Sequence, residues 1–355
     1  MSDEMDLGVL AESFAEMLGA EWPREKAIAW SRGNGTVDSE LWSAMAGLGW
    51  TALTVPEDHG GLGLGADAAL RLHCALGAAV APAPMLGTTV AAELLTAAGS
   101  DSQRAALLPG LADGSIRAAF ASADDAGIAA DGSGVSGTAA SLLDAPSATH
   151  LFLRASRGGK AGWLVVEADA AGVSIERHDF VDTTRTIGTV VLSGAAIGDE
   201  SFIAAEAGTV DAISRAAMLA IAGDAQGGGE AVLATTIEYM KVREQFGVLI
   251  GSFQALKHRV ADHQTALVAS RHLLEYAASL PADHPQALIY AISAKQHAAR
   301  MTAEMARDCI QLHGGVGFTS DFIPHLYLKR GKVNECLWGT RAANLDRIAD
   351  MLEAA

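Results

Sequence analysis

The sequence predicts a mostly α-helical protein with a small β-domain in its middle. Two changes of pattern support this. Alanine- and leucine-rich amphipathic runs give way near residue 116 to short β-type runs between glycine turns, and long alanine-rich runs return near residue 206. The chain of 355 residues exceeds the roughly 100–200 residues of a usual domain. We therefore expect an N-terminal helical domain at 1–115, a middle β-domain at 116–205 and a C-terminal helical bundle domain at 206–355.

The N-terminal part is expected to contain short helices. Apolar residues recur at helical spacing in the segments 12–18, 38–47, 66–76, 88–98 and 102–112. Pro56 and the glycines Gly60, Gly61 and Gly63 interrupt this pattern. Because proline lacks an amide hydrogen and glycine is a poor helix former, a loop is predicted there.

The middle part favours strands. Short runs of β-forming residues, separated by glycine and polar turns, occupy 117–121, 150–154, 162–167, 173–177 and 189–192. This spacing predicts a compact antiparallel β-domain.

Long helices are predicted in the C-terminal part, at 209–223, 230–244, 252–279 and 285–312. Their alanine content allows close approach between helices, so one face of a helix can pack inside the subunit and another against a neighbour. We therefore expect an oligomer. The glycines at 227–229 lie between the first two of these helices. Each costs a helix roughly 1 kcal/mol relative to alanine, and close backbone packing is the expected benefit.

Composition excludes several classes of protein. The chain has 25 Lys and Arg against 42 Asp and Glu, a formal net charge of −17, whereas nucleic-acid binders concentrate basic residues. No apolar run reaches the length of about 18 residues that a membrane span needs, and the first residues lack the pattern of a secretory signal. The three cysteines form neither a disulfide framework nor a zinc motif. We expect a soluble cytoplasmic protein that binds no nucleic acid, membrane or metal.

Two C-terminal strings carry groups suited to a phosphate-bearing ligand. The first, VREQFGVLIGSFQALKH, places Arg243 at a helix end, where it can donate paired charge-assisted hydrogen bonds to a phosphate. A solvated charge is the alternative role for Arg243. The second, QLHGGVGF, begins at Gln311, and its glycines allow backbone amides to approach a ligand closely.

These two strings, together with VPEDHGGLGL at 55–64, resemble the acyl-CoA dehydrogenase family in order and spacing. The resemblance covers essentially the whole chain and implies the acyl-CoA dehydrogenase fold, an FAD cofactor shared between subunits, and a dimer or tetramer. The residues that match the part of the site lent to a neighbour's FAD are Arg243, Phe246, Gln254, Gln311, Gly314 and Gly315. Thr340 matches the threonine of the family's Glu-Gly-Thr segment.

The resemblance implies an oxidoreductase that acts on CH–CH bonds. In the family reaction a carboxylate removes the α-proton of an acyl-CoA thioester while the β-hydrogen passes as hydride to the flavin. A base is needed because the α-proton is only weakly acidic.

Both positions that hold this base in the family are changed here. The residue before Gly339 and Thr340 is Trp338, and the alternative position on the preceding long helix is Ala217. Neither side chain can accept a proton. Asp224, two turns beyond Ala217, is a weak candidate for a substitute acid, with a packing role as its alternative. Glu230 and Glu335 fit the family pattern less well.

The flavin-holding part of the β-domain is also reduced. The family's Thr-Glu-Pro-type turn is replaced by a segment with Ser122 and two aspartates, and Ser122 offers a single hydrogen bond to flavin. The segment 182–185, Asp-Thr-Thr-Arg, matches a family string, although a turn with a salt bridge would have the same sequence.

The part of the FAD site that this chain would contribute to a neighbouring subunit is therefore expected to be intact. The part that would hold its own flavin is expected to be lost. This combination resembles a subunit of the heterotetrameric acyl-CoA dehydrogenases of steroid degradation, in which a second acyl-CoA dehydrogenase-like subunit would supply the base and the flavin cradle. The alternatives are a flavin monooxygenase of the same fold, a homo-oligomeric dehydrogenase that uses Asp224, and a non-enzymatic subunit.

Overall fold

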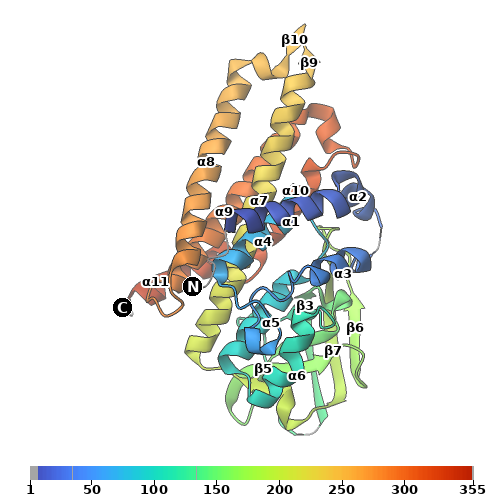
Figure 1. The fold of residues 1–355 in the computed structure, drawn as a ribbon, viewed down its shortest axis with the longest axis vertical. Helices are drawn as coiled ribbons and strands as arrows, with labels where there is room; N and C mark the ends of the chain where they lie inside the picture. Colours follow the sequence, from blue (N-terminus) through green and yellow to red (C-terminus); the bar gives the residue numbers. More distant parts are fainter. Residues whose placement is uncertain (1–6, 34, 133, 354–355) are drawn as a thin grey trace.

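The computed structural model describes residues 7–33, 35–132 and 134–353, and Figure 1 shows its course. A group of helices comes first, and two small sheets follow. The first group comprises α1 (Leu7–Glu21), α2 (Arg24–Trp30), α3 (Ser39–Gly47), α4 (Ala66–Ala78), α5 (Met85–Ala98) and α6 (Asp101–Ala112). The loop predicted around Pro56 is present and contains the 3-10 turn η1 (Glu57–His59).

The strands of the middle part form two sheets. The first sheet has the order β1-β4-β5-β8 with β2 also paired to β4, and the second has the order β3-β7-β6. Their bounds are β1 (Ala118–Phe120), β2 (Ile128–Ala129), β3 (Gly134–Leu143), β4 (His150–Arg157), β5 (Lys160–Glu167), β6 (Val173–Arg177), β7 (Ile187–Ala196) and β8 (Phe202–Ala204). The predicted antiparallel pairing is confirmed for β3 with β7, β7 with β6, β4 with β5 and β5 with β8. It is wrong for β1 and β2, which run parallel to β4.

The first sheet is buried on both faces. Along β4, Leu151 and Leu153 pack in a core shared with the second sheet, whereas Phe152 between them packs in the core of the helices. This follows from the alternation of side chains along a strand. The sheet therefore joins the β-domain to the helices on its other face.

The C-terminal part is built on long helices that extend away from the sheets (Figure 1). Its elements are α7 (Ala207–Val242), β9 (Glu244–Gln245), β10 (Val248–Leu249), α8 (Gln254–Ser279), α9 (Ala287–His313), α10 (Pro324–Cys336) and α11 (Arg341–Glu353). Within the described ranges, none of the helices has the length and apolar character that crossing a membrane requires.

α7 is one continuous helix, so the predicted division of this segment into two helices is wrong. The glycines lie in its interior, where α7 crosses α4 with the two backbones almost touching. A Cβ at Gly227 would lie 1.8 Å from the carbonyl oxygen of Cys74, and one at Gly77 would lie 1.9 Å from that of Asp224. The expected close backbone packing is confirmed, and tertiary contact explains why the glycines do not end the helix.

Candidate functional site

The two motif strings meet at one end of the long C-terminal helices, at the top of Figure 1. Arg243 directly follows α7, and the amide of Ile250 donates to its carbonyl oxygen at 2.8 Å, which folds the β9–β10 hairpin back onto the helix end. The glycine string forms the 3-10 helix η5 (Gly314–Phe318) after α9. The ring of Tyr239 stacks on His313 with centroids 4.5 Å apart and so connects the two strings.

The predicted ligand-holding side chains face outward at this end. Phe246 is 93% exposed, and its φ of 56° belongs to the left-handed region that a bulky residue seldom adopts. In the described part of the chain, the guanidinium of Arg243 and the side-chain amide of Gln311 have no hydrogen-bond partner. We call the six predicted ligand-holding residues the helix-end surface; they are Arg243, Phe246, Gln254, Gln311, Gly314 and Gly315. An exposed phenylalanine beside unpaired donors is typical of a surface that another molecule covers.

A second feature is a cavity of about 300 Å³ where the sheets meet α5 and the turn after α10. We call it the inner cavity. Apolar side chains and three carboxylates line it, among them Val90, Phe120, Trp338, Asp124 and Asp144, and no lysine or arginine belongs to its lining. Burial raises the pKa of Asp144 to about 6, against the opposing effect of Arg185.

The two positions where the family holds its base lie in a single apolar cluster. Ala217 on α7 is fully buried, and Trp338 is 7% exposed in the same cluster. The indole of Trp338 stacks on Phe120 with centroids 6.2 Å apart and lines the inner cavity. Neither position holds a group that accepts a proton, and at the second of them the indole packs against the first sheet.

Two buried polar side chains fix the turn that carries Trp338. Trp338 and Gly339 both have left-handed backbones, with φ of 54° and 94°. Lys295 on α9 donates through Nζ to the carbonyl oxygens of Glu335 and Gly339, at 3.1 and 3.0 Å. Asn344 on α11 donates to the carbonyl oxygens of Trp338 and Gly339, at 3.1 and 2.9 Å. The backbone of the turn that carries Trp338 is therefore held from α9 and from α11.

The segment after β1 is a turn that forms hydrogen bonds within itself. The amide of Ser122 donates to Oδ2 of Asp125 at 2.8 Å, and the hydroxyl of Ser122 accepts from the amide of Asp124 at 3.3 Å. Burial raises the pKa of Asp125, which accepts the bond from Ser122. The amides of Ser122, Asp124 and Asp125 are thus used within the turn, and the O–H of Ser122 is the side-chain donor that it leaves for a ligand.

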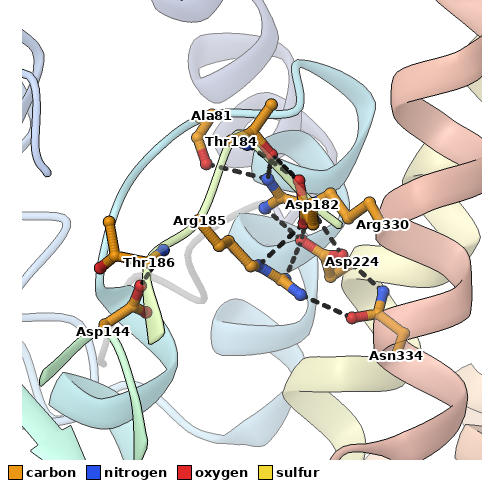
Figure 2. Close-up of polar contacts among 9 residues, drawn as sticks. All are labelled: Ala81, Asp144, Asp182, Thr184, Arg185, Thr186, Asp224, Arg330 and Asn334. Atoms are coloured by element: carbon orange, nitrogen blue, oxygen red, sulfur yellow. Dashed lines mark hydrogen bonds and ion pairs between the residues drawn. The ribbon is translucent and has the colours of Figure 1, made fainter. Parts of the chain in front are cut away.

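Asp224 lies at the centre of a buried ion network between the helices and the β-domain (Figure 2). Arg330 on α10 donates to both its carboxylate oxygens, the shortest bond being 2.6 Å, and Arg185 pairs with it at 2.9 Å. Asn334 donates to Oδ1 at 2.7 Å and accepts from Arg185 at 2.7 Å. Arg330 also donates to the carbonyl oxygen of Ala81.

This network leaves Asp224 poorly suited to accept a proton. Burial alone would raise its pKa, but Arg185, Arg330 and Asn334 hold the pKa well below its ordinary value. Both oxygens already accept hydrogen bonds, so the carboxylate has no free direction toward a substrate. We therefore assign Asp224 a structural role, and the string Asp182 to Arg185 contributes to the same network through Arg185 and Thr184.

His73 on α4 makes folding sensitive to acid. Burial lowers its pKa from 6.5 to about 4, the charge of Asp224 partly opposing this. Between pH 6.5 and 4 the unfolded chain binds a proton at His73 that the folded chain does not, so lowering the pH favours unfolding. From pH 7 to 5 the loss should be about 2 kcal/mol. We expect His73→Gln to remove that part of the pH dependence in urea unfolding measured at both pH values, and equal slopes for both proteins would contradict the assignment.

The structure places the predicted residues in two separate regions. The six of the helix-end surface follow or end the long helices at one end of the C-terminal part, whereas Trp338 and the exposed Thr340 line the inner cavity, and Ala217 is buried in the same apolar cluster as Trp338. Sequence reasoning missed Lys295, Asn344 and Arg330. Lys295 carried one available signal, because it is a lysine on the otherwise alanine-rich buried face of α9.

FAD fits one of these regions and not the other. Its pyrophosphate requires cationic and amide donors, which Arg243, Gln311 and the backbone of Gly315 present at the helix-end surface. Its flavin ring requires several donors as well, but the inner cavity is lined by three carboxylates, and the amides of its Ser122 turn are used within the turn, which leaves the hydroxyl of Ser122. The chain thus carries groups that suit the FAD of a neighbour, and its own cradle does not suit FAD.

Comparison with known proteins finds the same family in both helical parts of the chain. Residues 8–115 match the model of the acyl-CoA dehydrogenase N-terminal domain, and residues 213–353 match that of the acyl-CoA dehydrogenase C-terminal domain. The acyl-CoA dehydrogenase IpdE2 of Mycobacterium tuberculosis is 32% identical over 307 residues, which cover 86% of this chain and 83% of that protein.

Two solved structures are similar over nearly their whole length. One is a Tcur3481-Tcur3483 steroid ACAD variant, with a TM-score of 0.88, 29% identity and 98% coverage of both chains. The other is the ChsE4-ChsE5 complex from Mycobacterium tuberculosis, with a TM-score of 0.89, 25% identity, and coverage of 98% of this chain and 97% of that chain.

Proposed function

Because the chain belongs to the FAD-dependent acyl-CoA dehydrogenase family, we propose that it is the subunit of a hetero-oligomeric dehydrogenase that lacks the base and completes the flavin site of a partner. The partner is a second acyl-CoA dehydrogenase-like chain that supplies the flavin cradle and the carboxylate. The substrate is an acyl-CoA thioester, and a steroid side chain is the acyl group we favour.

The observation that carries this proposal is the pairing of Ala217 and Trp338 in one apolar cluster. Both places from which a carboxylate reaches the substrate in the family are apolar here, although one lies on α7 and the other in the turn between α10 and α11. A chain that used its own active site would need at least one of them. The exposed helix-end surface supports the complementary half of the proposal, because the side-chain donors of Arg243 and Gln311 have no partner within the described chain.

The residues of the helix-end surface would contact the partner's FAD in the mixed complex. Arg243 would donate to its pyrophosphate, Gln311 and the glycine amides would bind its ADP part, and Phe246 and Gln254 would lie against the cofactor and exclude water. FAD, when bound, supplies the hydride acceptor. This chain therefore binds and orients the cofactor, and proton removal is assigned to the partner.

The proposed partner and substrate class are supported by the similar solved structures. One is described as a Tcur3481-Tcur3483 steroid ACAD and the other as a ChsE4-ChsE5 complex, and both match this chain over at least 97% of their length. The identity of 32% to IpdE2 supports the same family activity.

Acyl-CoA turnover tests the proposal. We expect the chain alone to show no acyl-CoA-dependent reduction of an artificial electron acceptor, and its complex with a co-expressed second homologue to show such reduction with a steroid side-chain CoA thioester. The partner's base variant, its carboxylate changed to the amide, should abolish this activity. Full activity of the purified chain alone would overturn the proposal.

A further inference from the structure

A second cavity, open to solvent on one side, lies on the helical side of the molecule, separate from the inner cavity. It measures about 320 Å³ and is bounded by α4, α5, the first half of α7 and the turn after α8. Its walls are mainly alanine and leucine, including Ala69, Leu70, Ala216 and Leu219. We call it the helical cavity. Its volume falls in the range of small-molecule sites, which are mostly apolar with a few placed polar groups.

Two opposite charges line the helical cavity without forming an ion pair. Glu93 on α5 and Arg215 on α7 both contribute to its wall. Within the described ranges, Glu93 accepts no hydrogen bond, and Nε of Arg215 is buried without a partner. Burial raises the pKa of Glu93, which Arg215 partly offsets. Glu93 is half-buried, so its carboxylate opens onto the cavity as an acceptor that no donor of the described chain satisfies.

The reason the two charges stay apart is visible at the end of α8. Nη2 of Arg215 donates to the carbonyl oxygens of Ala277, Ala278 and Leu280, at 3.2, 3.1 and 2.7 Å. These are carbonyls that a helix end leaves without intrahelical partners. The guanidinium is therefore fixed at the α8 terminus, and Glu93 is left facing the cavity without a donor.

We propose that the helical cavity binds a neutral apolar molecule carrying a hydroxyl group, with the hydroxyl lying between Glu93 and Arg215. A hydroxyl both donates and accepts, so it satisfies the carboxylate and the guanidinium together. An anion would be repelled by Glu93 and a cation by Arg215, whereas the alanine and leucine walls match an apolar body. This site is independent of the function proposed above, because it shares no lining residue with the inner cavity or the helix-end surface.

Isothermal titration calorimetry with a matched pair of ligands tests the proposal. The full-length chain, in the complex if it purifies as one, is titrated with decahydro-2-naphthol and with 2-decalone, which has the same carbon skeleton but no donor. We expect the alcohol to bind about tenfold or more tightly than the ketone, since a hydrogen bond to a charged group has this magnitude. Equal affinity for the two ligands, or no binding of the alcohol, would overturn the proposal.

Variants locate the bound alcohol. Glu93→Leu should remove the preference for the alcohol, and Ala216→Phe should abolish binding of both ligands by filling the space. Ala234→Phe places the same side chain on an exposed position of α7 and should leave both affinities unchanged. Thermal unfolding confirms that each variant is folded, and Glu93→Gln provides a variant of almost unchanged shape. Unaltered alcohol binding in folded Ala216→Phe would contradict the assignment.

Discussion

Replacing Asp224 with alanine is expected to lower the free energy of unfolding by about 3–5 kcal/mol, because the change leaves two buried guanidinium groups without their shared carboxylate. Arg330 and Arg185 are both buried, and each pairs with Asp224 within 2.9 Å. Urea unfolding of the wild-type and variant chains measures the difference. The network also joins three parts of the fold, so the loss should appear as one cooperative transition at lower urea.

A matched control lies on the same helix. Asp211 pairs with Arg347 at 3.2 Å, but its side chain is 53% exposed. Asp211→Ala should therefore cost less than about 1 kcal/mol. Similar unfolding midpoints for the two alanine variants would show that the Asp224 network contributes little, and would reopen the assignment of Asp224 as a structural residue.

Replacing Arg243 with alanine in the mixed complex is expected to weaken FAD binding by about tenfold to a hundredfold. The estimate follows from the loss of charge-assisted hydrogen bonds to a phosphate, each contributing roughly 1.5–3 kcal/mol. Because Arg243 is exposed and has no hydrogen-bond partner for its guanidinium in the described chain, the variant should fold normally. Titration of the apo complex with FAD, followed by flavin fluorescence, gives the dissociation constant.

Lys241→Ala is the control for this experiment. Lys241 lies two residues before Arg243, is exposed, and pairs with Glu238 at 2.6 Å on the helix surface. The Lys241→Ala change removes one positive charge from the same end of α7, as Arg243→Ala does, but leaves the β9–β10 hairpin unchanged. We expect its FAD affinity to stay within about twofold of the wild type at physiological salt, where exposed charges are screened. Equal losses for both variants would indicate a general charge effect and contradict a specific role for Arg243.

The order of helices and strands was predictable because it depends on local periodicity. Helical spacing marked α4 to α6 and strand alternation marked β4 and β5, and the structure contains each of them. The continuity of α7 was not predictable, because local propensity disfavours the glycines and only the contact between Gly227 and α4 favours them. The parallel pairing of β1 and β2 with β4 likewise depends on long-range contacts.

The residues of the candidate site likewise divide into those that a local sequence pattern predicts and those that only long-range contacts bring together. The strings around Arg243 and Gln311 are contiguous in sequence, so their chemistry was visible before their proximity was known. The network of Asp224 with Arg330 and Arg185 joins residues from three distant segments, and no local pattern marks such a pair. Lys295 and Asn344, which hold the Trp338 turn, were missed for the same reason.

We infer that this chain completes a partner's flavin site and holds no flavin of its own. The most direct measurement is the number of FAD molecules per polypeptide in the purified mixed complex, from flavin absorbance and quantitative amino-acid analysis, beside the same ratio for the chain alone. We predict about one FAD for each pair of unlike chains and essentially none for the chain alone. One FAD per chain in a stable homo-oligomer that is reduced by an acyl-CoA would contradict the account.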